Sequence, residues 1–418
     1  MQRQDGSQTA APPLDLVLMG GRVIDPANGV DACLDVGLRD GRIACVAPHV
    51  IGGSDAQVVD VTGFIVTPGL VDIHTHVYPF VRTEAAYVGA LNAEAHLLAS
   101  GVTTTVDAGT VGWRDFADFK SWHIDRSKVR ILAMLNIAAG GMVVTATEQD
   151  PAAMQPEVVA ALAAAHPDTV VGIKSAHYWV REPWDEGHPP WISVDRAVEA
   201  GGLCGLPVMV DFWPRPPKRS HADLLLRKLR PGDIQTHFFA QQFPIVGDDG
   251  HVLPHLRAAR ERGVVFDLGH GAGSFWFRQA VPALRDGFAP DTISTDLHMA
   301  NVNGPVFSML ETMSKCLCMG MDLADVVARS TVAPARVIGR RDLGTLTEGA
   351  EADLAVLAHQ EGSYGYADCG AARMRGSQRL TCEMTLRAGE VVYDRQGLSM
   401  PDWERAPDAY WRIREVHI

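Results

Sequence analysis

Two histidines that stand two residues apart, His74 and His76, follow a short apolar run at residues 70–73. On a β-strand, successive side chains point to opposite faces, so this spacing places both imidazoles on the same face. Two neutral imidazoles at a strand end provide half of a binding site for a divalent ion such as Zn²⁺. The triplet alone is a weak signal in a chain with 16 histidines, so the assignment depends on the other ligands that the chain supplies.

Further polar side chains stand at or just after the ends of other apolar runs. In chain order they are Lys174, Asp211, His237, His270 and Asp296. Carboxylates and imidazoles are usual ligands of zinc and related ions. Because each of these residues follows a different predicted strand, they meet only if the fold gathers the strand ends at one place.

The middle of the chain repeats a strand, a loop and a helix. The predicted strands are residues 70–73, 103–106, 129–135, 169–173, 207–210, 233–236, 264–268 and 292–295. Helical stretches follow each of them, beginning with residues 84–99 and ending with residues 306–319. Eight such units predict a parallel sheet that closes into a (β/α)₈ TIM barrel, whose chemistry is carried on the loops after the strands.

Short β-strands also occupy both ends of the chain. Turn signals punctuate the apolar runs of residues 14–61, and strands return at residues 353–357, 380–387 and 391–393. The C-terminal hairpin cannot bury a face alone, and the N-terminal strands are available partners. We therefore expect a small discontinuous β-domain of residues 14–66 and 343–400 beside a barrel of residues 67–342; two separate β appendages are the alternative.

Composition excludes several classes of protein. Of the 418 residues, 47% are apolar and 21% charged, which is typical of a globular protein, and the formal net charge of −13 disfavours nucleic acid or an anionic membrane as a partner. The N-terminus lacks the apolar core of a signal peptide, and no apolar run reaches the roughly 18 residues of a spanning helix, so a cytoplasmic location is expected. The seven cysteines are odd in number and form no CxxC pair, which argues against a disulfide framework or a thiolate zinc site.

An ordered set of motifs resembles the amidohydrolase superfamily, and more closely its deacetylase and dihydroorotase-like branch. The motifs lie at residues 68–76, 101–107, 171–174, 233–237, 266–273 and 293–298. The resemblance implies a distorted eight-stranded barrel that holds one or two divalent ions, with zinc expected and manganese as the alternative. It also implies a small β-sandwich assembled from the two chain ends.

The resemblance assigns a role to each ligand position. It implies that His74, His76 and Asp296 bind the more buried ion and that His237 binds the second. It further implies that Lys174 carries a carbamate that bridges the two ions.

One position departs from the pattern of the superfamily. Where its members place a histidine at the end of the fifth strand, this chain has Asp211. Aspartate is itself a metal ligand, so a site for two ions survives in one interpretation, although the added charge would weaken their Lewis acidity. A site for one ion is the alternative. His177 and His298, which lie in loops, are not predicted as ligands.

The expected chemistry is hydrolysis of an amide or ester bond. A bound ion lowers the pKa of water toward neutrality, which yields a hydroxide nucleophile, and it polarises the carbonyl group. Asp296 would act as the general base and then as the acid toward the leaving atom.

Cationic and aromatic loop residues suggest a small anionic substrate. Arg181, Arg215 and His270 are the predicted substrate contacts. The resemblance points to N-acyl amino acids or O-acyl hydroxy acids. A cyclic-amide hydrolase of dihydroorotase type and a non-catalytic relative are the alternatives, and a homo-oligomer stays open.

Overall fold

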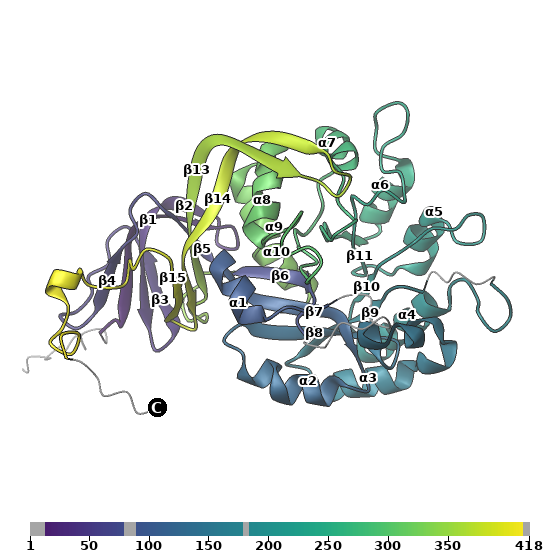
Figure 1. Cartoon of the computed structure of the whole chain (residues 1–418), viewed down its shortest axis with the longest axis horizontal. Helices are drawn as coiled ribbons and strands as arrows, with labels where there is room; N and C mark the ends of the chain where they lie inside the picture. Colours follow the sequence, from purple (N-terminus) through teal and green to yellow (C-terminus); the bar gives the residue numbers. More distant parts are fainter. Residues whose placement is uncertain (1–12, 79–88, 179–183, 413–418) are drawn as a thin grey trace, which may run out of the picture.

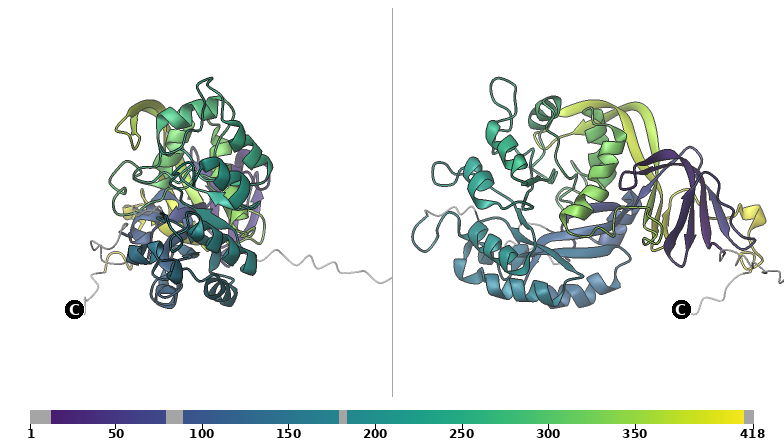
Figure 2. Two further views of the ribbon diagram at one scale, coloured as in Figure 1. Left: turned by 90° about the vertical axis from the view of Figure 1, so that its right-hand side faces the viewer. Right: turned by 180° about the vertical axis from the view of Figure 1, so that it is seen from behind.

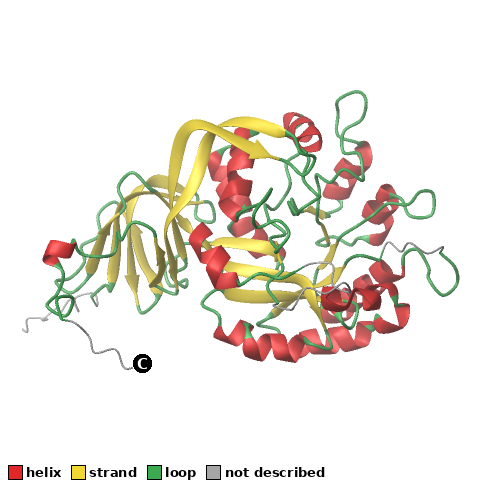
Figure 3. Ribbon diagram, viewed as in Figure 1, coloured by secondary structure: helices red, strands yellow, loops and turns green. Residues whose placement is uncertain are grey.

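Two β-sheets organise the chain, and the computed structural model describes residues 13–78, 89–178 and 184–412 of it. The first sheet is largely antiparallel and combines strands from both ends of the chain, whereas the second is parallel and comes from the middle (Figure 1). Most helices accompany the second sheet (Figure 3).

The parallel sheet follows the order of the chain. Its strands are β6 (Leu70–Thr75), β7 (Val102–Gly112), β8 (Arg130–Asn136), β9 (Val170–Ser175), β10 (Val208–Val210), β11 (Ile234–Gln235) and β12 (Val265–Phe266). Alternate side chains, such as those of Ile73, Val106 and Leu132, point inward and form an apolar core that is fully or almost fully buried. Parallel strands in chain order place all their carboxyl ends at one rim, as the sequence predicts.

The eighth predicted strand closes the barrel without forming a regular strand. Parallel bridges join Thr292 to Asp267, beside β12, and Leu297 to Thr75 of β6. The amide of Asp296 donates to the carbonyl of His74 at 2.6 Å. Asp296 has a φ of +50°, a left-handed conformation that interrupts an extended strand. The prediction of a distorted barrel is therefore confirmed, and its last strand is the distorted one.

Ten α-helices lie among the described residues. They are α1 (Ala93–Leu97), α2 (Phe116–Trp122), α3 (Pro156–Ala165), α4 (Ile192–Cys204), α5 (His221–Asp223), α6 (Pro254–Glu261), α7 (Phe277–Arg285), α8 (Met309–Cys318), α9 (Leu323–Arg329) and α10 (Val332–Val337). Only α1 represents the predicted helix of residues 84–99, part of which lies outside the described residues. None of the helices that the structure describes is long and apolar enough to cross a membrane.

Tighter and wider helical turns connect several of these elements. They are η1 (Leu98–Ser100), η2 (Ile124–Arg126), η3 (Gly141–Gln149), η4 (Pro151–Ala153), the π-helical turn η5 (Leu224–Lys228) and η6 (Trp403–Arg405). The longest, η3, follows β8 and kinks at Val144. It lies at the carboxyl end of the barrel strands and carries a buried glutamate, Glu148.

The other sheet unites the two chain ends. Its strands are β1 (Leu16–Asp25), β2 (Val30–Arg39), β3 (Arg42–Ala47), β4 (Gln57–Asp60), β5 (Ile65–Pro68), β13 (Leu354–Ala367), β14 (Arg373–Arg387) and β15 (Glu390–Asp394). The N-terminal strand β5 pairs with the C-terminal strand β13, so the two ends form one unit rather than two appendages. The strands enclose an apolar core of their own, separate from the barrel core.

The hairpin of β13 and β14 is longer than the sequence predicts. Its outer half leaves the small domain and runs over the barrel (Figure 1 and Figure 2). The amide of Leu380 donates to Ser314 of α8 at 2.9 Å. Near the tip, Asp368 accepts from the amide of Phe277 at the start of α7 at 3.1 Å. The hairpin therefore ties the small domain to two barrel helices.

A group of charged side chains lies where the barrel meets the small domain. Arg130 of β8 donates to Asp353 and to Glu351, each at 2.7 Å, and only 11% of its side chain is exposed. Arg387 of β14 contacts the same two carboxylates. These ion pairs between two arginines and two carboxylates join the two domains at this contact and help to fix their relative orientation.

Replacing Arg130 by alanine should destabilise the protein, because it removes two charge-assisted hydrogen bonds from Asp353 and Glu351. Such bonds contribute about 1.5–3 kcal/mol, so the free energy of unfolding should fall by about 2 kcal/mol. The control is Arg196→Ala, which removes an ion pair with Glu199 that is 41–45% exposed and should cost at most about 0.5 kcal/mol. Equal shifts in urea unfolding of the two variants would contradict this assignment.

Candidate metal centre and active site

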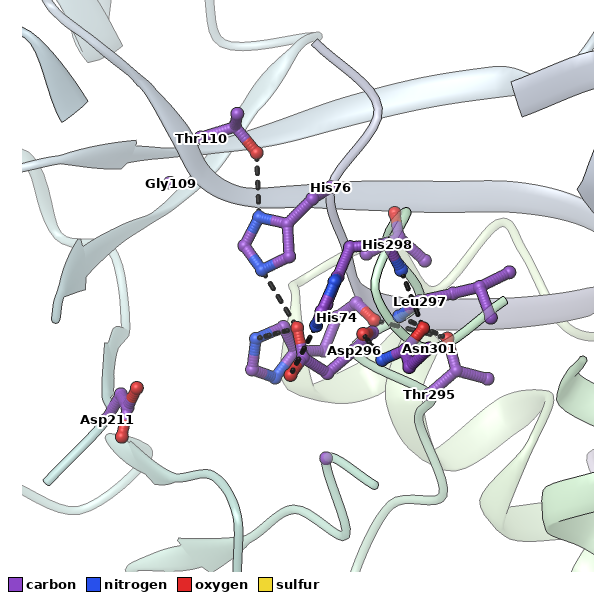
Figure 4. Close-up of polar contacts among 12 residues, drawn as sticks. His74, His76, Gly109, Thr110, Asp211, Thr295, Asp296, Leu297, His298 and Asn301 are labelled. Atoms are coloured by element: carbon purple, nitrogen blue, oxygen red, sulfur yellow. Dashed lines mark hydrogen bonds and ion pairs between the residues drawn. The ribbon is translucent and has the colours of Figure 1, made fainter. Parts of the chain in front are cut away.

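Three side chains from the first and last barrel segments meet at the carboxyl rim. His74 and His76 lie at the end of β6, and both are almost completely buried. The Nε2 atom of His76 lies 2.9 Å from Oδ1 of Asp296, and Nε2 of His74 lies 3.6 Å from the same oxygen. Figure 4 shows Asp296 against both imidazole rings. The spacing of two residues and the closure of the barrel thus bring the predicted ligands together.

The other ring nitrogen of each histidine is held by a hydrogen bond. Nδ1 of His76 lies 2.7 Å from Oγ1 of Thr110, and Nδ1 of His237 donates to the carbonyl of Gly269 at 2.6 Å. Nδ1 of His74 lies 2.8 Å from Oγ1 of Thr236. Partners of this kind fix the ring so that Nε2 faces the cavity, which is the arrangement found around metal-binding histidines.

The geometry of this cluster fits a divalent ion. One ligand atom each of His74, His237 and Asp296 lies within 4.8 Å of the others, and all three residues are buried. Two imidazole nitrogens and a carboxylate oxygen are the donor types that zinc and manganese take in proteins. The residues present therefore match the kind of group that the sequence predicts.

Lys174 and Asp211, the other two predicted ligands, line the same cavity. Lys174 ends β9 and is fully buried, with Nζ 3.1 Å from Nε2 of His74. Gly109 makes room for it, since a Cβ there would lie 2.6 Å from the side chain of Lys174. Asp211 follows β10 and lies apart from His76 and Asp296 (Figure 4). Its Oδ2 lies 3.5 Å from Nε2 of His237. All six predicted metal ligands thus lie around one cavity.

The cavity that they share has a volume of about 400 Å³. Its lining consists of these ligands together with other described residues, namely Met142, His177, Trp213, Gln241, Gln242, Ala272, Gly273, Ser274, His298 and Ala300. Apart from the metal-type side chains the walls are neutral, with amide, hydroxyl and apolar groups. A pocket of this size suits a small molecule.

His270, predicted to contact the substrate, does not line this cavity. Its buried ring stacks on Phe275 with centroids 4.5 Å apart. Nδ1 lies 3.0 Å from the carbonyl of Gly271, and Nε2 lies 2.9 Å from Nζ of Lys315. Both ring nitrogens have partners in the protein, and His270 is not among the described residues that line the cavity, so its contact with a substrate stays a prediction.

Of the two predicted arginines, only Arg215 lies among the described residues. The guanidinium of Arg215 stacks on the ring of Trp184, 4.4 Å from its centre, and Arg215 is not among the described residues that line the cavity. Arg181 lies outside the described residues. The contacts of both arginines with a substrate therefore stay predictions.

Two cavity residues that the sequence does not predict as ligands are His177 and His298. Nε2 of His177 lies 3.9 Å from Oδ2 of Asp211. Nε2 of His298 lies 4.0 Å from Oδ2 of Asp296, and its Nδ1 accepts from the amide of Ala300. Their places three residues after Lys174 and two after Asp296 are the sequence signals that could have identified them.

Similarity to known proteins identifies the family of this chain. A deacetylase from Enterococcus faecalis is 30% identical over 349 residues, which cover 83% of this chain and 90% of the relative. The chain belongs to the amidohydrolase family. The model of the Amidohydrolase family matches residues 277–392, which run from α7 to β15.

Two solved structures share the fold of this amidohydrolase. An adenine deaminase is 27% identical, with a TM-score of 0.81, and the match covers 91% of this chain and all of the other. A dihydroorotase is 26% identical, with a TM-score of 0.77 and coverage of 91% and 99%. The predictions of an amidohydrolase enzyme and of its branch are confirmed, and the alternative of a non-catalytic relative is dropped.

Burial and charge set the protonation of the amidohydrolase site in the absence of metal. Burial and the nearby charge of Lys174 lower the pKa of His74 to about 3, so its ring is neutral. Burial also disfavours a charge on His237, but the charge and hydrogen bond of Asp211 outweigh it and raise the pKa of His237 to about 9. Although burial opposes it, the neighbouring histidines hold the pKa of Asp296 well below its usual range. His237 and Asp211 therefore form an ion pair at neutral pH.

We expect the metal-free protein to lose stability in alkaline solution as this ion pair is lost. The pKa of His237 is about 9 in the folded protein, above its ordinary value of 6.5. A raised pKa contributes stability that is complete below the unfolded value and disappears as the pH rises through the folded one. Urea unfolding of chelator-treated protein at about pH 7 and about pH 10 measures the loss. Asp211→Asn should lose less, and an equal loss in both proteins would exclude the pair as its source.

Proposed function

We propose that this amidohydrolase removes the acyl group from N-acyl amino acids or O-acyl hydroxy acids. The observation that carries the proposal is the convergence of three Nε2 atoms, those of His74, His76 and His237, with Asp296 at the end of a cavity for a small molecule. The similarity to a deacetylase over most of both chains supports an acyl group as the part removed.

The ligands divide into two groups in this proposal. His74, His76 and Asp296 would hold the first ion, and His237 with Asp211 would hold the second. Lys174 would link the two groups, and its Nζ lies 3.1 Å from Nε2 of His74. Burial lowers the pKa of its ammonium group, which favours the neutral amine that reacts with carbon dioxide to form a carbamate. When bound, a divalent ion supplies Lewis acidity and activates water for attack on a carbonyl group.

Asp296 is placed to move the proton. Its backbone is held by a bond from its own amide to the carbonyl of His74 and by one from the side chain of Asn301 to its carbonyl, both 2.6 Å long. The neighbouring histidines hold the pKa of its carboxyl well below the usual range, so the carboxylate can accept a proton from the attacking water. It then returns the proton to the leaving nitrogen or oxygen atom, which completes the hydrolysis.

The walls of the cavity suit the rest of such a substrate. Trp213 and Met142 offer apolar surface, whereas Gln241, Gln242 and Ser274 offer hydrogen-bonding groups. A small acylated acid fills a cavity of about 400 Å³. An anionic substrate and a contact with Arg181 remain predictions, and that residue lies outside the described part of the chain.

A cyclic-amide hydrolase of dihydroorotase type is the second candidate, supported by the dihydroorotase structure that shares this fold. The two functions are separated by a screen of purified, metal-replete protein against acylated amino acids, acylated hydroxy acids and cyclic amides such as dihydroorotate. Turnover of acylated acids alone supports the deacylase. Turnover of the cyclic amide alone would replace it by the second candidate.

Asp296→Asn tests the proton transfer. The amide keeps an oxygen that can coordinate but cannot accept the proton, so kcat should fall by about 10²–10⁴-fold. Metal content, measured by elemental analysis, should change much less than the rate. Turnover close to that of the wild type would refute the role of Asp296 as the base.

Lys174→Ala tests the carbamate. We expect the variant to lose bound metal, and a small added carboxylate should restore part of the activity, because it can occupy the place of the carbamate oxygens. In the wild type, depletion of bicarbonate before metal is added should slow the recovery of activity. The control is Lys315→Ala, which removes another fully buried lysine that does not line the cavity. Unchanged metal content in Lys174→Ala would exclude the carbamate.

A further inference from the structure

His177 lies in the loop that follows β9, three residues after Lys174. It is buried, has a φ of +50° and lines the cavity. Its Nε2 atom lies 3.9 Å from Oδ2 of Asp211. Because β9 and β10 are neighbours in the barrel, the loop brings this imidazole to the end of the fifth strand.

A buried carboxylate sets the orientation of the His177 ring. Nδ1 of His177 lies 2.8 Å from Oε2 of Glu148, which is itself 1% exposed. Because a carboxylate accepts, Nδ1 is the nitrogen that donates, and Nε2 is directed toward the cavity as a potential ligand. The second oxygen of Glu148 accepts from the side chain of Asn136 at 2.9 Å. Gln149 of the same turn donates to the carbonyl of His177 at 2.7 Å, which holds the loop as well as the ring.

The same arrangement occurs at the three histidines already assigned to the site. In each, Nδ1 contacts an oxygen atom and Nε2 faces the cavity. A carboxylate partner on Nδ1 is a common support of metal-binding histidines, because it fixes the ring and makes the other nitrogen more basic. His177 therefore has the position and the support of a ligand.

We propose that His177 is a ligand of the second divalent ion and supplies the imidazole that Asp211 replaces at the end of the fifth strand. The inference rests on the proposed metal-dependent function. The second site would then contain two imidazoles, His177 and His237, and the carboxylate of Asp211. It would keep both nitrogen donors that a borderline ion such as Zn²⁺ or Co²⁺ favours, while the carboxylate adds a harder oxygen donor.

The proposed ligand set of His177, His237 and Asp211 also gives a role to Glu148. This buried carboxylate has no role if the six predicted residues are the only ligands. Glu148 acts as a positioning residue: it is not among the described residues that line the cavity, and it acts through the His177 ring, to which it is hydrogen-bonded. Burying a carboxylate costs free energy unless it is hydrogen-bonded, and Asn136 and His177 meet that need. The structural alternative is an ion pair that only anchors η3 to the loop after β9.

Metal titration of His177→Ala tests the assignment. Metal-free protein is titrated with Co²⁺, and the binding isotherm and the visible absorption spectrum of the bound ion are recorded. For the wild type we expect two equivalents, and for His177→Ala a weakened second equivalent with an altered spectrum. Removing a residue that only supports a metal ligand typically lowers the metal affinity about 10–100-fold. Removing the ligand itself should lower the affinity for the second ion by at least as much. The control Gln242→Ala, at another lining residue, should bind both ions as the wild type does.

Glu148→Gln keeps the ring and removes its charged acceptor, so it tests the same ligand even if His177→Ala folds poorly. The second equivalent should weaken by about 10–100-fold. Wild-type affinity and spectrum in folded His177→Ala, or in Glu148→Gln, would overturn the inference and leave the hydrolase function intact. A wild-type protein that binds no divalent ion would instead overturn the proposed function itself.

A double variant tests whether His177 takes the place of the imidazole that the position of Asp211 lacks. In His177→Ala with Asp211→His, a histidine returns to the end of the fifth strand. Recovery of wild-type affinity for the second equivalent of Co²⁺, which is weakened in His177→Ala alone, supports the substitution. A folded double variant that binds the second ion as weakly as His177→Ala does would count against it.

Discussion

The site depends on a buried carboxylate that joins the first and last strands of the barrel. Asp72 of β6 is fully buried and accepts from the amide of Thr295 at 3.1 Å and from its hydroxyl at 2.6 Å. Burial raises the pKa of Asp72 to about 7. These bonds hold the closing segment against β6, where Asp296 must stand to face His74 and His76. A regular strand would not direct Asp296 toward His74 and His76, because the residue turns toward the cavity through its left-handed backbone conformation.

A second carboxylate organises the opposite side of the cluster. Asp267 accepts hydrogen bonds from the hydroxyls of Thr236, Thr292 and Ser294, at 2.8, 2.6 and 2.7 Å. Because Thr236 donates to Asp267, its oxygen is available to accept from Nδ1 of His74. These two hydrogen bonds, from Thr236 to Asp267 and from His74 to Thr236, leave Nε2 of His74 as the nitrogen that faces the cavity. The hydroxyl residues at these strand ends serve the orientation of the ligands rather than the packing of the core.

The small domain contributes to the barrel through its long hairpin. The outer half of β13 and β14 covers α8, and Cys369 near the tip lies 3.4 Å from the carbonyl of Gly271. Gly271 has a φ of +59°, and a Cβ there would lie 2.6 Å from Asp296. The loop that passes so close to Asp296 is therefore backed by a strand pair that begins in the other domain.

The sequence by itself determined the order of the strands and the six residues that meet at the barrel rim, from His74 to Asp296. This was possible because strand periodicity is local and parallel strands in chain order place their ends together. Only the tertiary structure decided which neighbouring side chains join them. His270 follows its predicted strand closely, as His237 does, yet Nε2 of its ring lies beside Nζ of Lys315 and the residue does not line the cavity. His177 reaches Asp211 through a left-handed loop, and it is oriented by Glu148, 29 residues away in the chain. Such pairings depend on packing and hydrogen bonds between distant segments, which no local pattern encodes.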